Sequence, residues 1–157
     1  MSRIISSYFI ERESEREWER EYEREKLFGG RNSLFSFVQK LNLPQYPLKV
    51  ISEDGRTQIF DPVRRKYFVL TPEEWVRQHF IQFLHHEKGY PLSRMAVEKG
   101  IKVNKLAKRC DIVIYDENGQ PFLVVECKAP DVKITQETFD QAARYNISLK
   151  LPYLVVT

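Results

Sequence analysis

The stretch RCDIVIYDENGQPFLVVECK, residues 109–128, decides the fold because it predicts a β-hairpin. At its centre stands Asn118-Gly119, the residue pair that best tolerates the positive φ values of a two-residue type I′ turn. If the residues on either side of this pair close the turn, Asp111 lies directly opposite Glu126 on the neighbouring strand. The hairpin therefore brings two acidic residues together.

Side chains alternate along a strand, so the same register predicts two faces. One face carries Asp111, Val113, Val124, Glu126 and Lys128, and the other carries Cys110, Ile112, Val125 and Cys127. The middle of both strands is almost wholly apolar, as expected for strands that are covered on both sides. Cys110 and Cys127 stand opposite each other, but without a secretion signal we expect two reduced, buried thiols.

The closeness of Asp111 and Glu126 needs a physical explanation. Directly opposed residues have Cβ atoms roughly 5 Å apart, where two like charges are unfavourable. A divalent cation between the carboxylates reverses this effect, since Mg²⁺ is commonly held by one or two carboxylates with waters and phosphate oxygens. Lys128 would place an ammonium group beside a water or phosphate on that metal. The alternative is an exposed sheet face with its charges in solvent.

Five stretches together resemble the PD-(D/E)XK nuclease superfamily, especially the N-terminal nuclease domain of type I restriction enzyme R subunits and its small stand-alone relatives. They are TPEEWVRQ (71–78), AVEKG (96–100), RCDIV (109–113), VECKAP (125–130) and TQETFDQAARYN (135–146). The resemblance spans about residues 41–157. It implies an α/β fold with a restriction-endonuclease-like core, in which helices flank a mixed β-sheet.

The resemblance also implies roles for the hairpin residues. Asp111, Glu126 and the backbone carbonyl of Cys127 would hold Mg²⁺ or Mn²⁺. Lys128 would position or deprotonate the attacking water. These roles imply hydrolysis of DNA phosphodiester bonds.

Two helices contribute further candidates. Thr71 to Glu74 has the pattern of a capping box, with a helix expected to reach about Lys88. Family likeness implies that Glu74 approaches the metal, although capping explains it equally well. On a helix from Thr135 to about Leu149, Gln141 and Tyr145 match the Q-x-x-x-Y of related nucleases. There Gln141 would orient a water or phosphate and Tyr145 would contact DNA, the alternative being an ordinary surface glutamine beside a partly buried tyrosine.

Basic residues lead into the acidic hairpin, at Lys105, Lys108 and Arg109. Positive charge there would draw a polyanion toward the carboxylates, although a solvated loop would look similar. A second basic cluster, residues 64–66, is expected to be an exposed turn rather than a phosphate contact.

The chain divides into an extension, residues 1–40, and a nuclease-like domain, residues 41–157. The extension contains a Glu/Arg-rich repeat, residues 11–26, that predicts a marginal, solvated helix. Within the domain, residues 48–70 predict a small antiparallel β unit, and residues 71–157 the core with a further strand at 95–103. A strand at 152–157 ends the sequence, whereas relatives usually continue with at least one more.

Composition describes an ordinary protein of 157 residues with a formal charge of +3. No apolar run is long enough to span a bilayer, so we expect a cytoplasmic protein that does not associate with membranes. The sequence thus predicts a Mg²⁺-dependent DNA endonuclease module that works with DNA and a restriction-modification or repair partner protein. The alternative is a non-catalytic nucleic-acid- or protein-binding module that keeps the fold.

Overall fold

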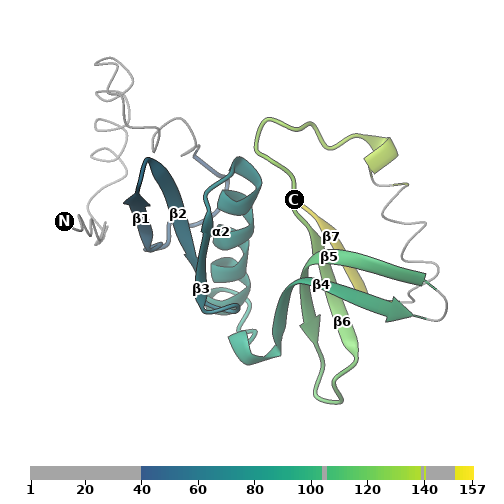
Figure 1. Cartoon of the computed structure of the whole chain (residues 1–157). Coiled ribbons are helices and arrows are strands. Elements are labelled where there is room, and N and C mark those ends of the chain that lie inside the picture. Colours follow the sequence, from purple (N-terminus) through teal and green to yellow (C-terminus); the bar gives the residue numbers. More distant parts are fainter. Residues whose placement is uncertain (1–39, 104–105, 139, 141–150) are drawn as a thin grey trace.

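The computed structural model describes residues 40–103, 106–138, 140 and 151–157. The protein is an α/β structure in which one helix, α2, lies between a three-stranded and a four-stranded β-sheet (Figure 1). The predicted α/β class with a mixed sheet is confirmed. The Glu/Arg-rich repeat lies outside the described residues.

The three-stranded sheet is the predicted small antiparallel unit. It contains β1 (Val50–Glu53), β2 (Arg56–Asp61) and β3 (Lys66–Val69), in the order β1-β2-β3. Glu53 pairs with Arg56, so the intervening Asp54-Gly55 forms a two-residue turn. Both turn residues have positive φ, 51° and 71°, which is the geometry of a type I′ turn.

Helix α2 (Pro72–His86) begins as the sequence predicts. The hydroxyl of Thr71 accepts a hydrogen bond from the amide of Glu74 at 3.0 Å, and Pro72 occupies the first helical position. At the other end Gly89, with φ 73°, lets the chain turn away, and the amide of Tyr90 reaches the carbonyl of Leu84 at 3.0 Å. The helix ends within two residues of its expected end.

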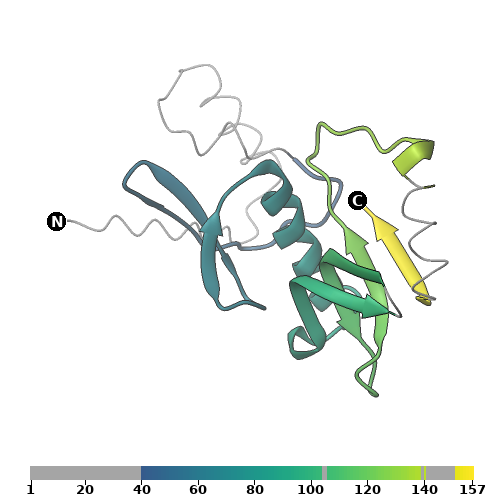
Figure 2. The same cartoon turned by 45° about the vertical axis from the view of Figure 1, so that its right-hand side comes forward.

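The four-stranded sheet has the order β4-β5-β6-β7. A short 3-10 helix, η1 (Leu92–Arg94), leads into β4 (Met95–Val103), β5 (Leu106–Tyr115), β6 (Pro121–Glu126) and β7 (Tyr153–Val156). The first three strands are antiparallel, and β7 runs parallel to β6 (Figure 2). In the connection from β6 to β7, residues 136–138 and 140 are helical, and the rest of the predicted helix lies outside the described residues.

The β5–β6 hairpin has the predicted register but not the predicted turn. Ile112 pairs with Val125, as expected, yet the loop closes at Asp116 and Gln120, whose amide and carbonyl lie 2.9 Å apart. The loop therefore holds three residues rather than two, and only its last residue, Gly119, has positive φ (71°). The pairing shifts by one residue between Ile114 and Tyr115, and this irregularity restores the predicted register in the rest of the hairpin.

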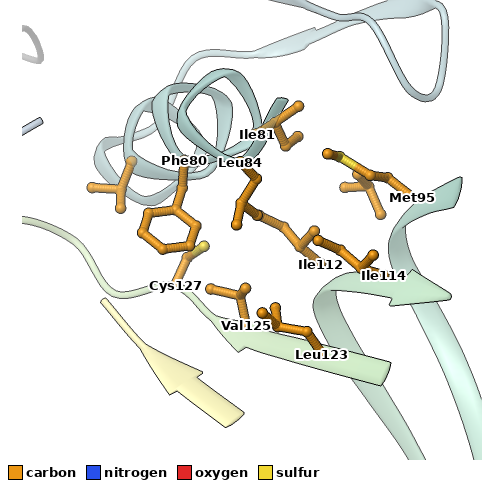
Figure 3. Packing of buried hydrophobic residues seen from close by; sticks show 11 residues of the cluster. Phe80, Ile81, Leu84, Met95, Ile112, Ile114, Leu123, Val125 and Cys127 are labelled. Atoms are coloured by element: carbon orange, nitrogen blue, oxygen red, sulfur yellow. The ribbon is translucent and has the colours of Figure 1, made fainter. Parts of the chain in front are cut away.

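The main core fills the space between α2 and the four-stranded sheet (Figure 3). Its buried members come from α2 and from β4, β5 and β6, with Cys127 just past β6: Val76, Phe80, Ile81, Leu84, Met95, Val97, Ile112, Ile114, Leu123, Val125 and Cys127. A second cluster contains Cys110, Val113, Val124 and Leu151. Hydrophobic burial on the α2 side thus fixes the hairpin against the helix.

The predicted alternation of faces is wrong at Cys110. Ile112 and Cys127 belong to the α2-facing core, as expected, but Cys110 packs with Val113 in the second cluster. Regular alternation would have put Cys110 with Ile112. The break in the pattern falls at Asp111, and both cysteines are buried thiols that form no disulfide. Within the described ranges, no helix is long and apolar enough to cross a membrane.

Candidate active site

Asp111 lies in β5, beside the end of β6, and two donors hold its carboxylate. The register that pairs Ile112 with Val125 places Asp111 opposite Glu126 when it is continued by one residue. Oδ2 of Asp111 accepts a hydrogen bond from the amide of Cys127 at 2.7 Å. Oδ1 accepts one from Nη2 of Arg77 at 3.0 Å. The carboxylate therefore faces α2, which explains the break in alternation at this residue.

Arg77 is a buried cation among acidic groups, with only 5% of its side chain exposed. Its Nη2 lies 2.7 Å from Oε1 of Glu73, and its Nη1 donates to Glu74 and lies 3.9 Å from Oε1 of Glu98. Burial alone would lower the pKa of Arg77, but Glu74 and then Asp111 outweigh this effect and raise it. The guanidinium therefore stays charged in the interior.

Arg64 brings a second cation to the same place from the turn between β2 and β3. It donates to Asp61 at 2.6 Å, and to Glu74 and Glu98 at 2.7 Å each. Its guanidinium also stacks on the ring of Phe68, 3.2 Å from the ring centroid. The expectation of an exposed basic turn is thus wrong for Arg64 and right for its neighbours at positions 65 and 66.

Gln78 joins the two arginines into one network. Its Nε2 donates to Oδ2 of Asp61 and to Oε1 of Glu74, at 2.9 Å each. Asp61 is fully buried and also accepts two backbone amides from its own turn. We call this set the two-arginine network, and its members are Asp61, Arg64, Glu73, Glu74, Arg77, Gln78, Glu98 and Asp111.

Glu98 extends the acidic pair into a row across three adjacent strands. The pairs on either side, Val97 with Ile112 and Lys99 with Cys110, put Glu98 opposite Asp111. Glu98 has φ 51°, a backbone conformation that is uncommon for residues other than glycine. The acidic row therefore runs Glu98, Asp111, Glu126, with a strained position at its first member.

Arg109 lies at the exposed edge of this row. Its Nη2 is 3.0 Å from Oε2 of Glu98, and 69% of its side chain is exposed. The predicted basic approach is thus present at this residue. Lys108 pairs through its backbone with Ile101 in β4, and Lys105 lies outside the described residues.

Glu126 and Lys128 form the more exposed half of the site. Nζ of Lys128 lies 3.3 Å from Oε1 of Glu126, and the two side chains are 33% and 25% exposed. The end of the chain holds their backbone, since the amide of Thr157 donates to Glu126 at 3.0 Å and the amide of Lys128 donates to Thr157 at 2.7 Å. Both side chains are thus fixed at the base and open to solvent at the tip.

Cys127 contributes through its backbone rather than its sulfur. Its side chain points into the core beside Phe80 (Figure 3), and burial raises the pKa of the thiol well above its usual range. A neutral thiol is a poor metal ligand, because the thiolate is the binding form. The amide of Cys127 holds Asp111, and its carbonyl is the group that the family resemblance implies for the metal.

Of the remaining predicted residues, Glu74 lies in the described part of the chain and two others do not. Glu74 is buried, and its carboxylate contacts Arg64, Arg77 and Gln78, so it belongs to the network besides capping the helix by its amide. Gln141 and Tyr145 lie outside the described residues.

Sequence reasoning missed six members of the network: Asp61, Arg64, Glu73, Arg77, Gln78 and Glu98. Local spacing could have indicated only part of it, since Glu73 and Glu74 stand four and three residues before Arg77 on one helix. The other contacts join separate elements, such as Arg64 to Glu98.

The geometry changes the argument for a metal. Arg77 already supplies a positive charge beside Asp111, so the acidic row does not need a divalent ion to be tolerated. In the part of the chain that the structure describes, no three His, Cys, Asp or Glu side chains are grouped closely enough to hold a metal ion. The donor chemistry of Asp111 and Glu126 still fits Mg²⁺, because both are carboxylates and their side chains are 19% and 25% exposed.

Comparisons with known proteins identify the family of the chain. No curated protein matches the sequence. A family model described as the type I restriction enzyme R protein N terminus matches residues 72–157, which is more than half of the chain. The match covers α2, the four-stranded sheet and the acidic row, and it begins just after the small sheet. The chain therefore belongs to the family of type I restriction enzyme R protein N-terminal domains.

Proposed function

We propose that this protein is a Mg²⁺-dependent endonuclease module with a PD-(D/E)XK core that hydrolyses DNA phosphodiester bonds. The observation that carries the proposal is the register of β5 and β6, which brings Asp111 opposite Glu126 with Lys128 two residues further on. Family membership supports a restriction-modification context. The partners would be DNA and a protein that selects the target.

Each site residue has one role in this proposal. Asp111, Glu126 and the carbonyl of Cys127 would hold the ion. Bound there, Mg²⁺ would neutralise charge on the scissile phosphate and lower the pKa of a coordinated water. Lys128, whose Nζ is 3.3 Å from Glu126, would hold the attacking water and the developing negative charge.

Basic and polar groups around the row would position the substrate. Arg109 is exposed beside Glu98 and would meet a phosphate, and Lys105 and Lys108, which precede it in the sequence, would add positive charge. Gln141 and Tyr145 would contact the water and the DNA backbone, as the family resemblance implies. Glu74 would act from behind the row, through Arg77 rather than as a direct ligand.

One observation favours a second function, a binding module that does not cut. Both oxygens of Asp111 have donors within the protein, Arg77 and the Cys127 amide, so the carboxylate is satisfied without a metal. Calorimetric titration with Mn²⁺ separates the two functions. Binding that is lost in Asp111→Asn supports the nuclease, whereas no binding at millimolar Mn²⁺ favours the binding module.

The direct test is cleavage of supercoiled plasmid with Mg²⁺. We expect EDTA to abolish cleavage, and Glu126→Gln or Lys128→Ala to reduce it by roughly 100-fold or more. Their free energies of unfolding should change by less than about 1 kcal/mol, because both side chains are partly exposed. Glu117→Gln, on the exposed hairpin loop, is the matched control and should cut normally. Full cleavage by Lys128→Ala would remove the proposed role of that residue.

A further inference from the structure

We propose that Arg77 is an exchangeable counter-ion of Asp111, which it neutralises before a divalent ion binds and releases when the ion arrives. The inference rests on the proposed function, because it concerns the metal affinity of the same site. It assigns to a residue of α2 the control of that affinity.

The contacts of Arg77 show how it could release Asp111. Its Nη2 is shared between two carboxylates, at 2.7 Å from Glu73 and 3.0 Å from Asp111, while Nη1 stays with Glu74. Losing the longer contact would leave the arginine with two acidic partners. Its Nε is buried without a hydrogen-bond partner, so the present arrangement does not use all of its donors. A small shift of the guanidinium away from Asp111 therefore leaves it paired.

Asp111 would keep its orientation after the exchange. Its Oδ2 is held by the amide of Cys127 at 2.7 Å, which is a backbone contact independent of Arg77. The carboxylate is also at the partly exposed side of the network, with 19% of its side chain accessible against 5% for Arg77. Part of the Asp111 side chain is therefore accessible to an ion from solvent.

Two effects of Arg77 on metal binding have opposite signs. A positioning residue strengthens binding, and its loss typically lowers metal affinity by roughly 10–100-fold. A fixed positive charge weakens binding, because it repels the divalent ion through a poorly screened interior. Since the Cys127 amide already orients Asp111, we expect the charge effect to be the larger one.

The experiment is calorimetric titration of Mn²⁺ into the full chain. Arg77→Gln removes the charge but can still donate to the neighbouring carboxylates, and we expect it to bind Mn²⁺ about tenfold more tightly than the wild type. Arg77→Lys retains the charge and should stay close to the wild type. Arg94→Gln is the matched control, since Arg94 forms an exposed ion pair with Glu117 at 3.3 Å. It should not change Mn²⁺ affinity.

A second variant covers the case in which Arg77→Gln folds poorly. Glu73 is 47% exposed, and Glu73→Gln leaves Nη2 of Arg77 to Asp111 alone. We expect a several-fold weaker Mn²⁺ affinity than in the wild type, because the arginine then holds Asp111 more firmly. Glu117→Gln removes a carboxylate on the exposed hairpin loop and should leave the affinity unchanged. An unchanged or tighter Mn²⁺ affinity in Glu73→Gln would contradict the inference.

The outcomes separate the two proposals. If the wild type neither binds Mn²⁺ nor cuts DNA, the proposed function fails and the inference fails with it. If the wild type binds Mn²⁺ but Arg77→Gln binds equally or more weakly, only the inference fails. Tighter binding by Arg77→Gln, together with a larger Mn²⁺-induced rise in its melting temperature, supports the exchange.

Discussion

Helix α2 buries two basic side chains, Arg77 and His79, and only Arg77 keeps its charge. Arg77 lies among carboxylates, chiefly Glu74 and Asp111, which more than offset its burial and raise its pKa. His79, two residues on, packs against Trp75 with tilted rings whose centroids lie 4.1 Å apart, and burial lowers its pKa to about 4. Burial acts in the same direction on both cations. The difference is the supply of acidic partners.

Cys127 shows that position beside the acidic row is not sufficient for charge. Burial, and then Asp111, raise the pKa of its thiol, so it stays protonated. The charged side chains at this site are therefore those that have a partner of opposite sign. These side chains, and not the thiol, can bind a metal or a phosphate.

A substitution that breaks the two-arginine network should have the largest effect on the free energy of unfolding. Arg64→Ala leaves Asp61 and Glu74, which are 0% and 5% exposed, without one of their cations. We expect a loss of about 3–5 kcal/mol in the free energy of unfolding, because buried carboxylates would be left uncompensated. Urea denaturation at neutral pH measures this loss.

Arg94→Ala is the control for this prediction, since it removes an exposed pair with Glu117 and should cost less than about 1 kcal/mol. Similar small losses in Arg64→Ala and Arg94→Ala would mean that the two-arginine network contributes little to stability.

The neutral side chain of His79 should make the free energy of unfolding depend on pH. His79 has a pKa of about 4 in the folded protein and about 6.5 when unfolded, so only the unfolded chain takes up a proton between these values. Its contribution is fully present above pH 6.5 and is lost as the pH falls toward 4. Between pH 7 and pH 5 the wild type should lose about 2 kcal/mol more than His79→Gln.

Urea denaturation of both proteins at the two pH values checks this difference. His86→Gln, on the exposed surface of the same helix, should keep the wild-type pH dependence. The same pH dependence in His79→Gln and the wild type would show that His79 is not neutral because of burial.

The smallest effect should come from the buried thiol. Because the pKa of Cys127 is raised, we expect iodoacetamide at pH 8 to leave it unmodified in the native protein and to modify it in urea. Cys127→Ala should cost only about 1 kcal/mol, the scale of a small cavity. Mass spectrometry of native and denatured samples measures the labelling. Rapid labelling of the native protein would instead mean that the Cys127 thiol is accessible and ionised.

The two hairpin loops show how far local sequence signals reach. Asp54-Gly55 forms the two-residue type I′ turn, with positive φ at both residues. Asn118-Gly119 has the stronger signal for that turn but does not form it, because Oδ1 of Asp116 accepts the amides of Asn118 and Gln120 at 2.8 Å each. Burial of the apolar face then restores the register, so Asp111 and Glu126 were predictable as neighbours although the loop was not.

The two-arginine network was beyond sequence reasoning for a physical reason. Arg64 contacts Glu98, and Arg77 contacts Asp111, each across 34 residues of chain. Neither pair has a spacing that marks it, because tertiary packing of α2 against both sheets creates the contacts. The predicted acidic pair could be inferred because one hairpin contains both of its members.

The place of Arg64 in the chain affects how the functional unit should be delimited. The family match begins at residue 72, whereas Asp61, at the end of β2, and Arg64, in the turn that follows, stand before it. A fragment that begins at residue 72 would retain every predicted catalytic side chain, but Glu74 would lose its contact with Arg64 and Gln78 its contact with Asp61. The short sheet and its turn thus supply partners to the residues beside the acidic row, and homology boundaries alone would exclude them.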